Sequence, residues 1–401
     1  MIDIPFHEAL RYVLEQASPL GVETVPLEEA TGRILAEEIV APFDMPGADN
    51  SAMDGFAVRS EECTGPAALT IAGYRPAGST GDTPTGRNAA VRIMTGAPIP
   101  EGFDAVVPLE EAVEEGGTVR IPGPVTPGAH VRRKGEDIAQ GDLVLRTGTV
   151  LRPPEISLIA SFGRTGIPVT RKPTVAILAT GDELVEPGEE IRPGAIVNSN
   201  SYSLASAVRE AGADPRMLGI ARDSLPALRK KLADGLTADV LITSAGVSAG
   251  DRDLVREALS GLGVREIFWK VRMRPGRPFA FGRKGNRPVF SLPGNPVSAL
   301  ITFEMLVRPA LRALLGDPVP VKPFVQGVLS EPIRKKAGRI QFLRVRAELA
   351  DGVWRARSAG DQSTGILRSL VRGNGIAVLP EDRTEFRAGE RVDLLPLYPR
   401  C

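Results

Sequence analysis

The chain has 401 residues, of which 42% are hydrophobic and 24% charged, a composition typical of a globular protein with several cores. Its 49 basic residues balance 49 acidic ones, which argues against a general nucleic-acid binder, and an aromatic content of 5% argues against a base-stacking surface. Two cysteines (Cys63, Cys401) and two histidines (His7, His130) are too few for a disulfide framework, a zinc site or a Ser-His-Asp triad. We therefore expect chemistry from carboxylates, hydroxyls, backbone amides and cations.

The N-terminus predicts a location. The first ten residues carry Asp3 and Glu8 and have no apolar core, so no signal peptide is expected. No apolar stretch approaches the roughly 18 residues that a membrane span needs. We expect a cytoplasmic protein with neither a membrane nor a nucleic acid as partner.

The first 172 residues show two kinds of pattern. Residues 1–42 and 137–172 predict a helical and extended platform, with helices beginning at Phe6 and covering Leu27–Val40 and Pro154–Phe162. Between them, residues 43–136 carry short apolar runs separated by Gly and Pro clusters, which is typical of a small all-β module. The runs are Phe56–Val58, Val91–Met94, Ala105–Val107 and Thr118–Ile121. We predict that this β module is inserted into the platform.

Residues 173–318 alternate between strand and helix patterns. The predicted strands are Val175–Ala179, Arg216–Ile220, Val240–Thr243, Glu266–Val271 and Val289–Leu292. The predicted helices are Ser201–Glu210, Leu225–Leu236, Asp251–Leu259 and Pro296–Leu315. This alternation predicts a parallel sheet covered by helices on both faces. Residues 319–401 return to short strands and predict a closing, barrel-like β domain. The fold class is therefore multidomain α/β.

Ligands of open parallel sheets bind beyond the carboxyl ends of the strands, so the segment after the first predicted strand is a candidate site. It reads Thr180-Gly181-Asp182-Glu183. Its adjacent carboxylates have the chemistry to hold a divalent cation or to exchange protons. The alternative is a turn in which Asp182 makes a local cap.

The segment after the third predicted strand runs from Ser244 to Asp253 and is rich in Gly and Ser. Such a segment, leading into a helix, brings backbone amides close to an anion. Asp251 and Asp253 suit a bridging Mg²⁺, but an ordinary N-cap role explains them equally well.

Two further segments predict oxyanion binding. In Leu292–Ser298, Asn295 fits an N-cap and Pro296 fits the first helical position, so the start of a helix is a sufficient structural explanation of this segment. The same helix start also exposes amides that suit a phosphate. Lys270–Pro278 carries four cations. We interpret it as a clamp for a tetrahedral oxyanion, because its prolines and glycine restrict the backbone, rather than as a solvated basic loop.

Polar turns mark the β module and its border. They are Asp49–Ala57, Met94–Pro98 and Lys134–Asp137. Taken singly, each is more typical of a turn than of a site.

Six strings occur together and in order: Asp49–Val58, Ile93–Pro98, Gly135–Asp137, Thr180–Leu184, Gly246–Asp253 and Leu292–Ser298. In this the chain closely resembles the MoeA-type molybdopterin molybdenumtransferases, a family that includes the C-terminal domain of gephyrin. The resemblance runs from about Phe6 to Leu397. It implies four structural parts, one of them an α/β domain of the molybdopterin-binding type. It also implies a homodimer whose active site lies where that domain meets the C-terminal β domain of the partner subunit.

The resemblance implies the last step of molybdenum cofactor synthesis. Molybdate is inserted into the dithiolene of adenylylated molybdopterin, with Mg²⁺, and AMP is released. The substrate supplies the thiolates, so no protein nucleophile is needed. Other enzymes of the pathway, the adenylyltransferase among them, are implied as protein partners.

Residue roles follow from the resemblance alone. It implies a catalytic set of Asp54, Thr95, Asp137, Glu183 and Asp251. It implies metal ligands among Glu183, Asp251 and Asp253. It implies a substrate-binding set of Thr180, Gly181, Asp182, Ser244, Gly246, Ser248, Arg274, Arg277, Pro278, Pro293, Gly294, Asn295, Pro296, Ser298, Arg339, Arg344 and Ser363.

The chain departs from the family pattern at three places. Arg274 and Arg277 replace two lysines, which keeps the charge but substitutes planar forks for point charges. Ala245 replaces a usual Gly, and Arg252 replaces a usual Tyr.

Two other functions compete with this interpretation. The related adenylyltransferase shares the α/β domain, but its loop is rich in Gly-Gly-Thr-Gly where this chain has Ser244–Ser248, and it lacks the β module. The second competing function is that of a non-enzymatic scaffold. The sequence shows no long linker or interaction tail, which argues against a scaffold as the main role.

Overall fold

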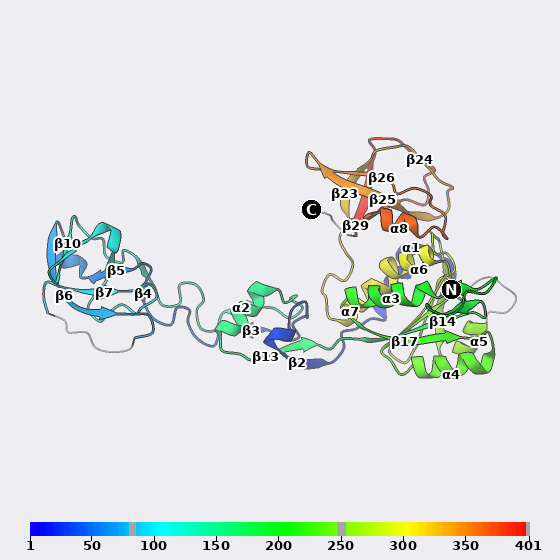
Figure 1. Cartoon of the computed structure of the whole chain (residues 1–401), viewed down its shortest axis with the longest axis horizontal. Coiled ribbons are helices and arrows are strands. Elements are labelled where there is room, and N and C mark those ends of the chain that lie inside the picture. The colour runs from blue at the N-terminus through cyan, green and yellow to red at the C-terminus, as the bar shows by residue number, and fades with distance from the viewer. Residues whose placement is uncertain (80–85, 247–253, 398–401) are drawn as a thin grey trace. The chain divides into compact units, whose positions relative to one another are not determined.

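The computed structural model describes residues 1–79, 86–246 and 254–397. The chain divides into two compact units, which we describe one at a time (Figure 1). The large unit comprises Met1–Ala36, Gly148–Leu151 and Gly166–Cys401, and the small unit comprises Glu37–Thr147 and Arg152–Thr165. No described helix is both long and apolar enough to cross a membrane.

The large unit is built on a seven-stranded sheet of order β1-β19-β21-β22-β18-β14-β17. Its strands are β1 (Ile2–Ile4), β14 (Thr174–Thr180), β17 (Asp214–Ala221), β18 (Val240–Ser244), β19 (Arg265–Val271), β21 (Ala280–Lys284) and β22 (Arg287–Leu292). All neighbours pair in parallel except β21, which is antiparallel to both β19 and β22. The predicted α/β fold class is confirmed, although β1 and β21 were not among the predicted strands.

Alternate side chains of β14 enter two separate cores, as expected for a strand buried on both faces. Val175 and Ile177 pack with α3 (Ser199–Glu210), while Ala176 and Leu178 pack with α4 (Leu225–Gly235) and α5 (Leu254–Gly261). Figure 1 shows α4 and α5 together at the sheet. The predicted helices over both faces are therefore present.

The predicted helix Pro296–Leu315 forms as one run of α6 (Pro296–Thr302), a π-helical turn (Phe303–Val307) and α7 (Arg308–Leu314). Pro309 gives a physical reason for the wider turn. Proline has no N–H, and its ring would collide with the carbonyl four residues earlier in a regular α-helix. Helix α1 (Phe6–Glu15) packs against this run through the buried Ala9 and Val13.

The C-terminal part of the large unit is a closed five-stranded barrel. Its strands β25-β26-β23-β29-β27 form a ring because β25 also pairs with β27. The bounds are β23 (Val325–Leu329), β25 (Ile340–Ala350), β26 (Val353–Ser358), β27 (Gly375–Leu379) and β29 (Arg391–Pro396). Short elements complete it: β20 (Met273–Arg274), β24 (Ile333–Arg334), β28 (Glu385–Phe386) and α8 (Arg368–Arg372).

The small unit contains the predicted β module. Its six-stranded sheet has the order β8-β5-β7-β6-β10-β9. The strands are β5 (Gly55–Val58), β6 (Ala67–Arg75), β7 (Ala89–Ile93), β8 (Ala105–Pro108), β9 (Val113–Glu115) and β10 (Thr118–Ile121). Two strand pairs and one helix accompany it: β3 (Ile39–Val40) with β12 (Leu143–Leu145), β4 (Asn50–Ser51) with β11 (Val131–Arg132), and α2 (Pro153–Ser161).

The predicted helix Leu27–Val40 is wrong. The segment forms one 3-10 turn (Leu27–Glu29), a left-handed Gly32 with φ +75° and strand β3. Ala30 and Ile34 are buried and four residues apart, as on one helix face, which explains the error. Instead Ile34 bridges Val150, and the β-branched residues favour extended backbone. The strand before it, β2 (Val22–Pro26), pairs with β13 (Gly166–Thr170).

Candidate functional site

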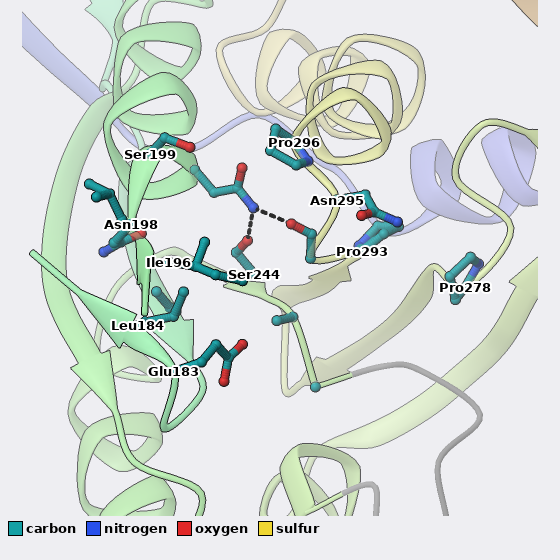
Figure 2. Close-up of a pocket in the computed structure, with 16 residues that line it drawn as sticks. Glu183, Leu184, Ile196, Asn198, Ser199, Ser244, Pro278, Pro293, Asn295 and Pro296 are labelled. Carbon is teal, nitrogen blue, oxygen red and sulfur yellow. Dashed lines mark hydrogen bonds between the residues drawn. The ribbon is translucent and has the colours of Figure 1, made fainter. Parts of the chain in front are cut away.

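The carboxyl ends of β14, β18 and β22 lie side by side in the large unit, and a cavity of about 400 Å³ opens there (Figure 2). Parallel strands bring the loops that follow them to one edge, so segments far apart in sequence meet. The lining is Ala179, Glu183, Leu184, Ile196, Val197, Asn198, Ser199, Asn200, Ser244, Ala245, Gly246, Pro278, Pro293, Gly294, Asn295 and Pro296. Eight residues of the predicted site therefore meet: Glu183, Ser244, Gly246, Pro278, Pro293, Gly294, Asn295 and Pro296.

Gly181 lets Glu183 fold back toward the end of β14. Its φ is +146°, a conformation that favours glycine, and a Cβ on it would lie 2.7 Å from the Glu183 carboxylate oxygens. Thr180, the last residue of β14, is buried, whereas Glu183 is exposed at the cavity. This loop therefore presents a carboxylate and hides its hydroxyl.

A third carboxylate, that of Asp223, lies beside the predicted pair Asp182 and Glu183. The Asp223 amide donates to Asp182 at 3.1 Å. Burial raises the pKa of the Asp223 carboxyl, and the negative charges of Asp182 and Glu183 raise it further. Sequence reasoning did not select Asp223, although a carboxylate two residues after β17 was the available signal. A bound cation would relieve this crowding of negative charge.

The loop after β18 combines two left-handed residues. Ala245 has φ +77°, and its amide donates to the Leu292 carbonyl at 3.1 Å. Gly246 has φ +76°, and a Cβ there would approach Val255 Cγ2 to 2.2 Å. Left-handed backbone is costly for an L-residue, and Ala245 adopts it here without the conformational freedom of glycine. Ser248, Asp251 and Asp253 lie outside the described residues.

The helix start at Asn295 was predicted and is present. Asn295 is the N-cap of α6 and Pro296 occupies the first turn, but no side-chain capping bond forms. The exposed Asn295 amide is thus not used by the helix, and the first-turn N–H groups add positive potential to this wall of the cavity. Ser298 is buried one turn later, at 3% exposure.

The start of α3 forms the opposite wall, and sequence reasoning missed it. Asn198 is the N-cap of α3, and Asn200 donates hydrogen bonds to Ser244 Oγ at 2.9 Å and to the Gly294 carbonyl at 2.8 Å. The signal was the Asn198-Ser199-Asn200 run before a predicted helix, which is rich in capping residues. It marks a helix start but does not say which loops lie opposite.

The predicted clamp does not converge as four free cations. Arg277 Nε pairs with Asp3 at 2.9 Å, and Lys270 Nζ lies 3.8 Å from the centre of the Trp269 ring. Arg272 lies 3.7 Å from Glu381. Arg274 is exposed, and no acidic partner pairs with it within the described ranges. Arg274 is therefore the cation of this segment best available to an anion.

The predicted site residues of the barrel differ in their exposure, and so in whether a ligand can contact them. Arg344 is 1% exposed, and its guanidinium donates to Ser369 Oγ and to the carbonyls of Asp361 and Ser363. Burial lowers the pKa of Arg344. The negative charge of Asp361 raises this pKa, and the positive charge of Arg274 lowers it further. Arg339 and Ser363 are exposed. Strand β20 belongs to the Lys270–Pro278 segment and pairs with β25, so the barrel contacts this segment within one chain.

The small unit holds the remaining predicted residues. Thr95 donates both its amide and its hydroxyl to Asp54. Asp137 is exposed and its amide donates to the Met45 carbonyl at 3.1 Å. Among the residues that the structure describes, no group of three or more His, Cys, Asp or Glu side chains is arranged to hold a metal ion.

Family models match nearly the whole chain. "MoeA N-terminal region (domain I and II)" matches residues 4–163, "Probable molybdopterin binding domain" matches residues 176–313, and "MoeA C-terminal region (domain IV)" matches residues 326–397.

Curated relatives match almost the whole length of the chain. Molybdopterin molybdenumtransferase 2 of Mycobacterium tuberculosis is 39% identical over 403 residues, 97% of this chain and 98% of that protein. Molybdopterin molybdenumtransferase of Haemophilus influenzae is 37% identical and covers 97% of each chain. The crystal structure of a molybdopterin biosynthesis MoeA protein from Pyrococcus horikoshii superposes with a TM-score of 0.85 at 31% identity, covering 99% of this chain and 100% of that one. The chain therefore belongs to the MoeA family of molybdopterin molybdenumtransferases.

Proposed function

We propose that this protein carries out the final step of molybdenum cofactor biosynthesis, inserting molybdate into the dithiolene of adenylylated molybdopterin with release of AMP. The observation that carries the proposal is the cavity at the carboxyl edge of the sheet. There a carboxylate (Glu183), a hydroxyl (Ser244) and the N-terminus of a helix (Asn295, Pro296) face one space. A phosphate-bearing ligand needs donors and positive potential, and this wall supplies both.

The side chains present bind and orient; none needs to attack. Ser244 and the amides of Gly294 and Asn295 suit phosphate oxygens, and Arg274 suits a tetrahedral oxyanion such as molybdate. The thiolates come from the substrate. This division explains how a transferase functions with two cysteines and two histidines.

We further propose Mg²⁺ as a cofactor. Glu183 would hold it together with Asp251 and Asp253. Burial, and then the negative charges of Asp182 and Glu183, raise the pKa of the Asp223 carboxyl, and this gathering of carboxylates favours a cation here. When bound, Mg²⁺ would neutralise charge on the nucleotide phosphates. Glu183 itself is exposed and lines the cavity, and no residue of the described ranges pairs with its carboxylate.

We propose a cytoplasmic homodimer with four structural parts, in which Asp54, Thr95 and Asp137 belong to the same active site as the cavity residues. Mixing an inactive Asp54→Ala chain with an inactive Glu183→Ala chain tests shared sites. Partial recovery of activity means that residues of two subunits form one site. No recovery means that each site uses a single chain for both residues.

The function is tested by reconstitution with purified protein, adenylylated molybdopterin, Mg²⁺ and molybdate. We expect AMP release that requires molybdate and stops when Mg²⁺ is chelated. Pyrophosphate release from ATP and molybdopterin would instead identify the adenylyltransferase. Peptide binding without any molybdate-dependent turnover would identify a scaffold.

A further inference from the structure

Asn200 connects three elements at the cavity. It lies in the first turn of α3, and its side-chain nitrogen donates to Ser244 Oγ at 2.9 Å, at the end of β18, and to the Gly294 carbonyl at 2.8 Å, after β22. Figure 2 draws both hydrogen bonds as dashed lines, one of them ending at Ser244. One amide therefore links the neighbouring loops that follow β18 and β22, both of which line the cavity.

The Gly294 carbonyl determines the orientation of this amide. A carbonyl oxygen only accepts hydrogen bonds, so the Asn200 group that faces it must be the nitrogen. The same nitrogen faces Ser244, so Ser244 Oγ is the acceptor in that bond. A serine hydroxyl carries one proton of its own. Ser244 lines the cavity, and no described residue accepts a hydrogen bond from it, so its proton is available to a ligand there.

Stability does not explain an amide at this position. The Asn200 Oδ1 atom is closed to water and has no hydrogen-bond partner in the described part of the chain. A buried polar atom without a partner costs free energy, which an apolar side chain of similar size would avoid. What the amide contributes instead is the pair of bonds to the cavity loops.

We propose that Asn200 is a positioning residue that makes Ser244 a hydrogen-bond donor toward an anionic oxygen of the ligand. This rests on the proposed function and deepens it: the acceptor is a phosphate oxygen of the adenylylated substrate. Ser244 shares the cavity with the start of α6 at Asn295 and Pro296, where the helix N-terminus also favours negative charge. The site therefore selects a ligand that presents an acceptor, rather than a donor, at Ser244.

Four variants test this assignment. Asn200→Leu removes both donated bonds, Asn200→Asp keeps the side-chain volume but replaces the donor with an acceptor, and Ser244→Ala removes the proposed donor. Ser203→Ala is the matched control, because its hydroxyl bonds to the Asn200 carbonyl on the same helix (3.0 Å) without lining the cavity. KM and kcat for adenylylated molybdopterin are measured by AMP release, AMP affinity by calorimetry, and thermal unfolding by fluorescence.

We expect Asn200→Leu and Ser244→Ala each to raise KM and the AMP dissociation constant by about tenfold, the value of one hydrogen bond to a charged group. Asn200→Asp raises them more, because a carboxylate takes the Ser244 proton and repels the phosphate. The double variant Asn200→Leu/Ser244→Ala is no worse than either single one, since Asn200 acts through Ser244. The melting temperature of Asn200→Leu changes little, because removal of the unpaired Oδ1 offsets the loss of the two donated bonds. Ser203→Ala resembles the wild type.

Additive losses in the double variant would overturn the assignment, as would unchanged KM and AMP affinity in Asn200→Leu and Asn200→Asp. Failure of the proposed function is recognised separately, because the wild type would then release no AMP. AMP binding still decides the role of Asn200 in that case. A wild type that does not bind AMP, or variants that bind it equally well, would also refute the assignment.

Discussion

Thr95 donates two hydrogen bonds to one oxygen of Asp54: its backbone amide and its hydroxyl both lie 2.7 Å from Oδ1. The amide bond, followed by the hydroxyl bond, lowers the pKa of the Asp54 carboxyl, because both stabilise the charged form. The pair joins the residue before β5 to the turn after β7. Asp54 is therefore kept as a carboxylate, suited to accept hydrogen bonds or bind a cation rather than to donate a proton.

Asp54→Ala is expected to abolish AMP release while the protein stays folded, because the carboxylate lies in a turn and not in a core. Thr95→Val is expected to raise the pKa of Asp54 toward its ordinary value, and Thr95→Ser to keep it low. Carbon NMR of the labelled carboxyl measures the pKa, and AMP release measures activity. Full activity of Asp54→Ala, or an unchanged Asp54 titration in Thr95→Val, would contradict this role.

Arg274→Ala is expected to raise the molybdate concentration needed for half-maximal rate by about tenfold, with a smaller change in KM for the nucleotide substrate. The reason is that Arg274 is exposed without an acidic partner among the described residues. Arg277→Ala should have a weaker effect, since Arg277 is already paired with Asp3.

Lys284→Ala, at an exposed position of β21, controls for the loss of one positive charge. Rates over a molybdate titration at saturating substrate give the comparison. Equal molybdate dependence in Arg274→Ala and Lys284→Ala would rule out Arg274 as an oxyanion ligand.

Gly276→Ala is expected to lower the free energy of unfolding by about 3 kcal/mol. Gly276 has φ +105°, and an added Cβ would lie 2.3 Å from Thr302 Cγ2. Gly285→Ala is the control, because Gly285 also has positive φ (+59°) but has open space around it. It should cost only about 1 kcal/mol.

Urea unfolding followed by tryptophan fluorescence suits this test, as both tryptophans, Trp269 and Trp354, belong to the large unit. A cost for Gly276→Ala no larger than that for Gly285→Ala would show that the backbone at Gly276 relaxes away from Thr302.

Asp239 is expected to give the large unit an acid-dependent stability. Its pKa lies at about 2, lowered first by the paired Arg171 guanidinium (both bonds 2.8 Å) and then by the amide and hydroxyl of Thr174. Because the folded pKa lies below the unfolded one, the contribution is present above about pH 4 and is lost as the pH falls toward 2. It amounts to about 2 kcal/mol at neutral pH.

Asp239→Asn should remove that contribution and flatten the stability profile between pH 4 and pH 2, as measured by urea unfolding. Asp234→Asn is the control, because its pair with Arg216 is loose (3.4 Å) and 60% of the Asp234 side chain is exposed. A profile for Asp239→Asn as steep as that of the wild type would show that other carboxylates carry the acid dependence.

Much of the large unit could be predicted because its signals are local. Buried parallel strands read as short apolar runs, so β14, β18 and β22 were found close to their observed bounds. The residue types of Asn295-Pro296 alone predict a helix start, and α6 starts there. The family itself followed from ordered motifs and is confirmed over the whole chain.

The errors arise where apolar spacing or pairing depends on distant partners. Leu27–Val40 has helical spacing but forms β contacts, because Ile34 and Leu35 meet Val150 and Val169. Strand β21 was missed because it is a short antiparallel insertion between β19 and β22, which the alternating strand and helix pattern does not announce.

The sequence by itself determined which residue types end each strand, and thus that carboxylates, hydroxyls and helix-start amides gather at one edge of the sheet. Only the tertiary structure decided which of those groups remain free for a ligand. Arg277 is held by Asp3, 274 positions away, while Arg274 is not, and Asn200 orients Ser244 from 44 positions away. Such pairings depend on three-dimensional proximity, because no local propensity links residues at these separations.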